Sequence, residues 1–288
     1  MKIARFSRGA DISFGVLDVD GDAEDGGGAA TVLGNAGADG GAGAGAGGAV
    51  DAAGELVVLA GDPMYAGFET TGERVALAEV KVLAPVLPRS KIVGIGRNYA
   101  DHAVERGAEV PEEPMMFLKP NTAVVGPGDA VVLPPGAGRV DHEVELAIVI
   151  GRILRNGTLA QARDAVFGYT IGQDISAREL QDKDRQWGRA KGFDTFCPLG
   201  PFIETELDLS GARIQARVNG ELRQDGVLGQ MVHKVDELVA FASSVFTLLP
   251  GDVILSGTPA GVGPLADGDL LESSIEGIGV LRNPVRNA

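Results

Sequence analysis

Residues 141–150 read DHEVELAIVI, an acidic cluster that runs into an unbroken apolar segment. The β-branched apolar residues predict a buried strand from Glu143 to Ile150. Side chains at positions i and i+2 of a strand share a face, so Glu143 and Glu145 point the same way, with Cα atoms about 6.6–7 Å apart. Burying two like charges costs free energy unless a cation lies between them. The stretch therefore predicts a cation site at the start of a buried strand, with a solvated strand end as the alternative.

A third carboxylate, that of Asp174, ends a second apolar segment, VFGYTIGQD at residues 166–174. Side chains from different strands converge at strand ends, so we expect Asp174 to join Glu143 and Glu145. Three carboxylates without a cysteine pair suit Mg²⁺ or Mn²⁺ rather than structural zinc. His142 would face away from its two neighbours, so we expect it to pack or to support the site rather than bind the ion.

Strand-length apolar segments recur along the chain, separated by Gly, Pro and Asp. Expected strands cover residues 2–6, 13–19, 55–59, 79–85, 92–95, 130–133, 165–171, 214–218, 253–255 and 279–281. Expected helices are fewer and cover residues 159–165, 177–183 and 234–246. Because the strands outnumber the helices and do not alternate with them, the sequence predicts a β-rich α+β fold rather than a doubly wound one.

Glycine and alanine fill almost all of residues 26–54. Such a segment has too little apolar surface to offset the entropy of ordering it, so we interpret it as a flexible insertion in a loop. Prolines at positions 85 and 88 indicate a boundary near Leu87. We therefore expect a small N-terminal αβ domain over residues 1–87 and a larger domain over residues 88–288 that carries the acidic cluster.

The charge balance is strongly acidic, with 25 Lys and Arg against 40 Asp and Glu and a formal net charge of −15. Its field repels phosphate backbones and anionic surfaces, so nucleic acid is not an expected partner. No signal-peptide core or membrane-spanning apolar run occurs, so we expect no membrane association. The single cysteine, Cys197, cannot form an intrachain disulfide, which favours a cytoplasmic location. We expect its thiol to be packed rather than nucleophilic.

The segment GRNYADHAVE at residues 96–105 carries a candidate acid–base pair. If the chain is helical after Asn98, His102 and Glu105 are three residues apart and meet on one face. The carboxylate then fixes the imidazole tautomer and raises its basicity, as a group that orients a general base does. The alternative is a surface histidine beside a surface glutamate on a short helix.

Polar and positive side chains follow the acidic segments, namely Arg178, Gln181 and Lys191. Three carboxylates around one dication keep a net negative charge, so an anionic substrate needs cations nearby. The segment SGTPAGVG at residues 256–263 also offers backbone N–H groups and the Thr258 hydroxyl to an anion. The alternative is that the charged residues are solvated surface groups.

Several longer motifs occur together between about residues 91 and 285. They are GRNYADH at 96–102, FLKP at 117–120, HEVEL at 142–146, QDISAR at 173–178, AKGFDTFCPLGP at 190–201, VNGELRQ at 218–224 and LSGTPAGVG at 255–263. In these motifs the chain resembles the fumarylacetoacetate hydrolase superfamily, in its acylpyruvase and oxaloacetate-decarboxylase-like branch. The resemblance implies a folded mixed β-sheet roll, a homodimer and a central Mg²⁺ or Mn²⁺.

The resemblance also implies roles for individual residues. The implied metal ligands are Glu143, Glu145 and Asp174, the implied catalytic residues are His102 and Glu105 on a mobile lid together with Lys191, and the implied substrate-binding residues are Arg97, Tyr99, Arg178, Gln181 and Thr258. Loops and the N-terminal domain are expected to shape the part of the pocket that selects the substrate.

For function, the resemblance implies divalent-metal-dependent cleavage of a C–C bond in a small anionic 2-oxo acid, through a metal-chelated enolate. Acylpyruvate hydrolysis and oxaloacetate decarboxylation both fit this description. One alternative is an isomerase or tautomerase of an unsaturated 2-oxo diacid of the 2-hydroxyhepta-2,4-diene-1,7-dioate type. Another is a catalytically silent member of the family.

Overall fold

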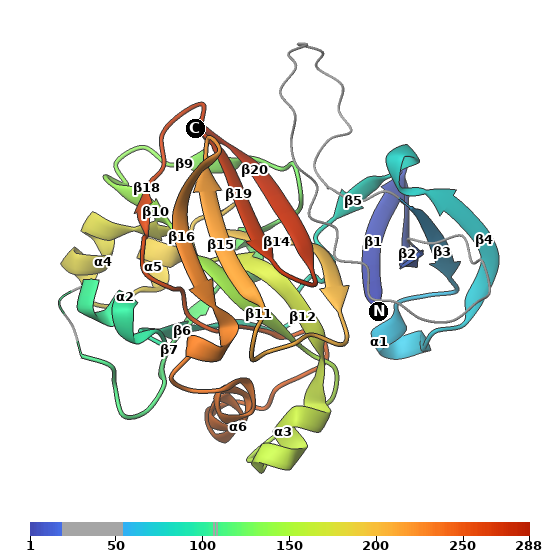
Figure 1. Cartoon of the computed structure of the whole chain (residues 1–288), viewed down its shortest axis with the longest axis horizontal. Helices are drawn as coiled ribbons and strands as arrows, with labels where there is room; N and C mark the ends of the chain where they lie inside the picture. The colour runs from blue at the N-terminus through green and yellow to red at the C-terminus, as the bar shows by residue number, and fades with distance from the viewer. Residues whose placement is uncertain (19–53, 106, 108) are drawn as a thin grey trace.

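The computed structural model describes residues 1–18, 54–105, 107 and 109–288. Two large sheets and a small three-stranded one form most of this part of the chain, with short helices around them (Figure 1). The arrangement confirms the β-rich α+β class predicted from the sequence. The expected Gly/Ala-rich insertion lies outside the described residues except for Gly54. No helix in the described ranges has both the length and the apolar character needed to cross a membrane.

The N-terminal strands form one end of the largest sheet, with β1 to β4 paired in succession. The elements are β1 (Lys2–Arg8), β2 (Asp11–Asp18), β3 (Glu55–Leu59), α1 (Pro63–Ala66), β4 (Thr70–Ala76), η1 (Leu77–Glu79) and β5 (Lys81–Leu83). Phe6 and Leu56 are buried in their shared core. Strand β1 also pairs with β14, with Ile3 opposite Ile203. The N-terminal part therefore continues the sheet of the rest of the chain.

Strand β11 (Val144–Ile150) lies inside the largest sheet, between β12 (Val166–Gln173) and β17 (Val253–Leu255). All seven of its residues are buried. A strand covered on both faces needs an unbroken apolar run, which explains why the segment after Glu143 does not alternate. Beyond β17 the sheet ends with β6 (Ile92–Gly96) and β7 (Met115–Lys119).

The second sheet and two helices complete the main core. The sheet has the order β16-β15-β19-β20-β9 and contains β9 (Val131–Leu133), β15 (Arg213–Val218), β16 (Glu221–Val227), β19 (Leu270–Ile275) and β20 (Gly279–Asn287). Helices α3 (Leu159–Ala165) and α6 (Val235–Val245) lie beside each other at one end of the sheets (Figure 1). Ile148 of β11, Ile214 of β15 and Leu238 of α6 belong to one buried cluster. Burial of these apolar faces is the main stabilising contribution to this packing.

The third sheet, of order β13-β10-β18, is small and gathers chain segments around Glu143. It contains β10 (Val140–His142), β13 (Ser176–Ala177) and β18 (Gly263–Pro264). The prediction of one strand from Glu143 onward was therefore wrong at its start, because Glu143 lies between β10 and β11. Its N–H donates to Oε1 of Gln173 at 2.8 Å, and its carbonyl accepts from the N–H of Asp174 at 2.9 Å.

Strand β14 (Cys197–Glu204) is an interior strand that was not expected from the sequence. Pro198 and Pro201 lack the N–H that a ladder requires, and prolines argue against an interior strand. All eight residues are nevertheless buried, and the pairing with β12 shifts register between Tyr169 and Ile171. Tertiary burial therefore outweighs the local preference here. The remaining short elements are η2 (Asn121–Ala123), β8 (Val124–Val125) and η3 (Leu228–Gln230).

Candidate metal centre and active site

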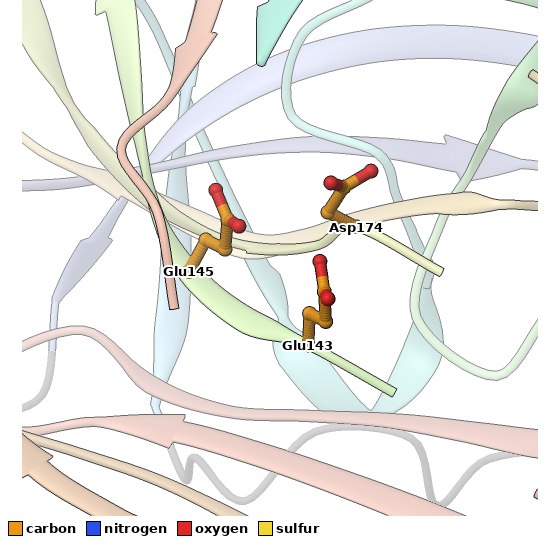
Figure 2. A group of neighbouring side chains, drawn as sticks. All are labelled: Glu143, Glu145 and Asp174. Carbon is orange, nitrogen blue, oxygen red and sulfur yellow. The ribbon is translucent and has the colours of Figure 1, made fainter. Parts of the chain in front are cut away.

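Three buried carboxylates converge where β10, β11 and β12 meet (Figure 2). Glu143 joins β10 to β11, Glu145 is the second residue of β11, and Asp174 directly follows β12. The three residues are 4%, 2% and 1% exposed, and one oxygen from each lies within 4.8 Å of the others. Antiparallel pairing of β11 with β12 produces this proximity, since Val144 lies opposite Gln173.

Two buried lysines provide positive charge next to this triad. Lys191 ends α5 (Gly188–Lys191), and its Nζ donates to Oε2 of Glu143 at 2.9 Å, to Oγ of Ser176 at 2.8 Å and to Oδ2 of Asp174. Lys119 ends β7, and its Nζ donates to Oδ1 of Asp174 at 2.6 Å. The sequence analysis did not identify Lys119 as a site residue. Its signals in the sequence were its place at the end of an otherwise apolar segment and its membership of the FLKP motif at 117–120.

The environments of the two glutamates differ in charge. Burial alone would raise the pKa of Glu143, but the charges of Arg178 and Lys191 hold that pKa well below its ordinary value. Burial raises the pKa of Glu145 well above its ordinary value, and the charges of Asp174 and Glu143 add to this effect. Glu145 forms no salt bridge with any described side chain, and its Oε2 accepts a hydrogen bond from the Gly257 N–H at 2.8 Å.

The donor set fits a hard divalent cation. It consists of carboxylate oxygens from three buried residues, the ligand type that Mg²⁺ and Mn²⁺ prefer. Among the described residues no cation forms a salt bridge with Glu145, since Lys191 pairs with Glu143 and Asp174, so a bound dication would be its direct counter-ion.

His102 and Glu105 meet on α2 (Ala100–Glu105), with Nδ1 of His102 3.1 Å from Oε2 of Glu105. At this distance a protonated Nδ1 donates to the carboxylate, which leaves Nε2 for proton transfer. His102 is buried and lines the same cavity as the acidic triad. Oε1 of Glu105 accepts from the N–H of Gly261 at 3.1 Å, so the carboxylate is held on both sides.

Asn98 fixes the segment that leads into α2. Its side-chain amide donates to the carbonyls of His233 at 3.0 Å and Ser256 at 2.8 Å, and its Oδ1 accepts from the His233 N–H at 2.8 Å. These contacts tie the start of α2 to two distant segments. The sequence analysis used Asn98 only to mark the start of the helix.

A cavity of about 160 Å³ joins the triad to His102, while Glu105, which contacts His102, is not part of its lining. Its lining includes most of the expected site residues, namely Arg97, His102, Glu143, Glu145, Asp174, Arg178, Gln181, Lys191 and Thr258, together with Ile95, Gly96, Asp182 and Trp187. Helices α2, α4 (Arg178–Asp184) and α5 lie on the opposite side of the molecule from β1 to β4 (Figure 1). The described lining begins at Ile95, so no described residue of the expected N-terminal domain lines this pocket.

Small residues allow aromatic rings to close over β6. A Cβ added to Gly94 would lie 2.1 Å from the Phe117 ring, and one added to Gly96 would lie 2.6 Å from the Trp187 ring. The next residue, Arg97, has φ +59°, a conformation that is uncommon for a residue with a side chain. This backbone places Arg97 at the cavity wall beside Trp187.

Tyr99 does not line the cavity, so the structure does not support the expected contact with substrate. It is 3% exposed, packs in the main apolar core and forms an isolated bridge with Met231. Burial, followed by the charge of Glu145, raises its pKa. Arg97, Tyr99 and His102 belong to the same motif, GRNYADH. The side chains of Arg97 and His102 line the cavity, whereas that of Tyr99 faces the core.

The loop at residues 256–263 contacts the site, but its polar groups already have partners. The Thr258 hydroxyl donates to the carbonyl of Val144 at 2.7 Å and accepts from Nε2 of Gln224 at 2.7 Å. The N–H groups of Gly257 and Gly261 donate to Glu145 and Glu105. The expectation of free donors for a substrate anion was therefore wrong at these groups: the two N–H groups bind carboxylates of the protein itself, and the hydroxyl binds a backbone carbonyl.

His142 packs away from the triad, as its position in the sequence predicted. Its Nδ1 lies 2.9 Å from Oε1 of Gln224, and it is fully buried. Burial lowers its pKa, so the ring is neutral near neutral pH. His142 therefore borders the triad without joining it and contacts Gln224 instead.

Cys197, at the start of β14, is fully buried. Burial raises the pKa of its thiol to about 12, so the reactive thiolate is scarce near neutral pH. We expect iodoacetamide at about pH 8 to leave Cys197 unmodified in the folded protein and to modify it in denaturant. Mass spectrometry of the digested protein measures this difference. Modification of the folded protein at the rate of a free thiol would contradict the packed-thiol interpretation.

The fold and the site define a class of protein in which a β-rich scaffold gathers an acidic triad and a glutamate-bound histidine around one cavity. The family model described as fumarylacetoacetate (FAA) hydrolase C-terminal matches residues 91–286, and the one described as Rv2993c-like, N-terminal matches residues 1–85. The chain belongs to the fumarylacetoacetate hydrolase superfamily, which confirms the resemblance of the motifs.

Two relatives in this family illustrate the similarity in sequence. Protein Rv2993c of Mycobacterium tuberculosis is 51% identical over 218 residues, which cover 75% of this chain and 82% of that protein. The mitochondrial oxaloacetate tautomerase FAHD2B of Bos taurus is 46% identical over 223 residues, which cover 72% of this chain and 70% of that protein.

Solved structures are similar over the fold as well as the sequence. The 5-carboxymethyl-2-hydroxymuconate delta-isomerase from Mycobacterium smegmatis has a TM-score of 0.83 at 42% identity, and the match covers 100% of both chains. Fumarylpyruvate hydrolase from Pseudomonas aeruginosa, in complex with Mn²⁺ and pyruvate, has a TM-score of 0.67 at 34% identity. That match covers 72% of this chain and 92% of the other.

Proposed function

We propose that this protein is a divalent-cation-dependent enzyme that breaks the C3–C4 bond of a small 2-oxo acid, by acylpyruvate hydrolysis or oxaloacetate decarboxylation. The observation that carries the proposal is the cavity itself, which is lined by the buried triad and by His102. Glu143, Glu145 and Asp174 would hold Mg²⁺ or Mn²⁺. The Mn²⁺ bound to the fumarylpyruvate hydrolase relative supports this ion type.

When bound, the cation would draw electron density from the keto and carboxylate oxygens of the substrate. Lys191, whose pKa is raised because the charges of Asp174 and Glu143 outweigh its burial, keeps a positive charge beside these oxygens. Arg178 and Gln181 line the same wall and orient the carboxylate of the substrate. Together these groups favour a transition state in which negative charge moves onto C3 and the keto oxygen as the bond breaks.

His102 supplies the proton transfers. In acylpyruvate hydrolysis, Nε2 takes a proton from water, the hydroxide adds to the C4 carbonyl, and the C3–C4 bond breaks. Carbon C3 keeps the electron pair and then takes up a proton, which gives pyruvate and a carboxylic acid. In oxaloacetate decarboxylation the same bond breaks, CO₂ leaves and C3 is protonated. Glu105 holds the ring and stabilises its protonated form.

Tautomerisation or isomerisation is a second candidate function. The observation that favours it is that His102 is the only histidine lining the cavity among the described residues, and one acid–base group suffices to move a proton to and from C3. The names of the tautomerase and isomerase relatives also favour it. In this reaction no carbon–carbon bond breaks.

A product-resolved assay tests the proposal and separates the candidates. The protein is stripped of metal with EDTA and assayed with Mg²⁺ or Mn²⁺ on oxaloacetate, acetylpyruvate and fumarylpyruvate. We expect pyruvate to form with either ion and not in EDTA. Exchange of the C3 protons with solvent deuterium, without smaller products, would replace cleavage by tautomerisation. Mn²⁺ binding with neither result would indicate a catalytically silent member of the family.

A further inference from the structure

Asp141 is a fully buried carboxylate of β10 that lies outside the acidic triad. Oδ1 accepts from Nε of Arg139 at 2.7 Å, and Oδ2 accepts from Nη2 of Arg139 at 3.1 Å and from Nε of Arg178 at 2.8 Å. Neither the cavity lining nor the triad includes Asp141. Its carboxylate therefore acts on the site only through the arginines.

Arg178 connects Asp141 to the triad. Its guanidinium has one nitrogen on each of three partners, with Nε on Asp141, Nη2 on Oε1 of Glu143 at 2.6 Å and Nη1 on Oε1 of Gln181 at 3.0 Å. The side chain is 6% exposed, so these contacts are not screened by bulk water. A planar guanidinium held at Nε has a fixed plane, and this sets where its other two nitrogens point.

We propose that Asp141 is a positioning residue that fixes the plane of Arg178 and thereby orients Glu143 for cation binding. The inference rests on the proposed function in one respect, because it requires that the triad holds a divalent cation. Without Asp141, Arg178 keeps its charge but loses the contact that fixes its plane. Its unbalanced charge then opposes the cation, and Glu143 loses a defined orientation. Both effects weaken cation binding.

Arg139 offers a matched comparison. It contacts the same carboxylate but is 52% exposed at its side chain and does not reach the triad. If Asp141 only stabilised β10, loss of either arginine contact would have the same consequence. If it positions Arg178, only changes along the path from Asp141 through Arg178 to Glu143 alter cation affinity.

The test is the affinity for Mn²⁺, measured by titration calorimetry and by the EPR signal of the free ion, on the full chain without substrate. We expect Asp141→Asn to weaken Mn²⁺ binding by about 10–100-fold, the effect typical of losing a group that orients a metal ligand. Arg139→Gln is expected to change it by less than about fivefold, as for an exposed ion pair. Thermal unfolding in EDTA reports whether each variant is folded.

Combining substitutions at Asp141 and Arg178 separates a positioning role from a general loss of structure, because the losses of Mn²⁺ affinity should then not add. In an Arg178→Met background, Asp141→Asn is expected to cause little further loss of Mn²⁺ affinity, because the group it orients is absent. If Asp141→Asn does not fold, Arg178→Lys tests the same path, since it keeps the charge and removes the planar fork. It is then expected to weaken Mn²⁺ binding to the same extent.

The outcomes distinguish failure of the proposed function from failure of the positioning role of Asp141. Wild-type protein that does not bind Mn²⁺ would overturn the proposed function, and the inference with it. Wild-type protein that binds Mn²⁺, with unchanged affinity in folded Asp141→Asn or in Arg178→Lys, would overturn the positioning role alone. Equal losses in Asp141→Asn and Arg139→Gln would also overturn it.

Discussion

Glu145→Gln is expected to abolish turnover and to weaken Mn²⁺ binding by more than about 100-fold, while the metal-free protein becomes no less stable. Glu145 is buried beside two other carboxylates and has no side-chain cation paired with it among the described residues. A neutral amide removes one of three like charges, and its oxygen still accepts from the Gly257 N–H. Glu143 and Asp174 do not allow this separation, because both pair with buried cations: Glu143 with Arg178 and Lys191, and Asp174 with Lys119 and Lys191.

Calorimetric titration with Mn²⁺ and thermal unfolding in EDTA measure the two parts of this prediction. Asp225→Asn is the matched control, since Asp225 is an exposed carboxylate paired with Arg213, outside the cavity lining. We expect the control to bind Mn²⁺ and to turn over substrate like the wild type. Wild-type Mn²⁺ affinity or activity in Glu145→Gln would show that the triad is not the cation site.

His102→Asn is expected to lower kcat by about 10²–10⁴-fold, the usual contribution of a general acid or base. Asparagine cannot exchange a proton near neutral pH, whereas the other groups that would bind substrate remain in place. His102 makes its side-chain contact with Glu105 and is not one of the three cation ligands proposed. Mn²⁺ affinity should therefore stay within a few-fold of the wild-type value, so binding and chemistry separate in one variant.

His233→Asn provides the histidine control for this measurement. His233 contacts the carbonyl of Pro111 through Nε2 at 3.3 Å and does not line the cavity. Its kcat should change little. An unchanged kcat in His102→Asn would contradict the assignment of the proton-transfer group, and loss of Mn²⁺ binding in that variant would show that His102 acts on the cation instead.

The sequence predicted those features that leave a local pattern. The unbroken apolar run after Glu145 indicated a strand buried on both faces, and β11 is such a strand. Glu143, directly before β11, and Asp174, directly after β12, meet because β11 and β12 pair antiparallel. The three-residue spacing of His102 and Glu105 produces their contact on α2.

Contacts between distant segments left no such pattern. Lys119 reaches Asp174 across 55 positions, and Arg178 reaches Asp141 across 37. A single buried lysine looks like a surface lysine in a sequence, and an aspartate beside a histidine looks like part of an acidic cluster. Only the folded chain shows that Thr258 already has its hydrogen-bond partners.

The pairing of β1 with β14 has a consequence for shortened forms of the chain. Phe202 of β14 packs among side chains of the N-terminal strands, including Ala4 and Phe6, and Ile203 lies opposite Ile3. A fragment lacking the first three strands would expose the Phe202 ring and would leave β14 as a sheet edge with unpaired backbone groups. Exposed edge strands can pair with strands of other molecules. Truncation would therefore promote self-association and lower solubility, even though the cavity with the acidic triad is formed on the far side.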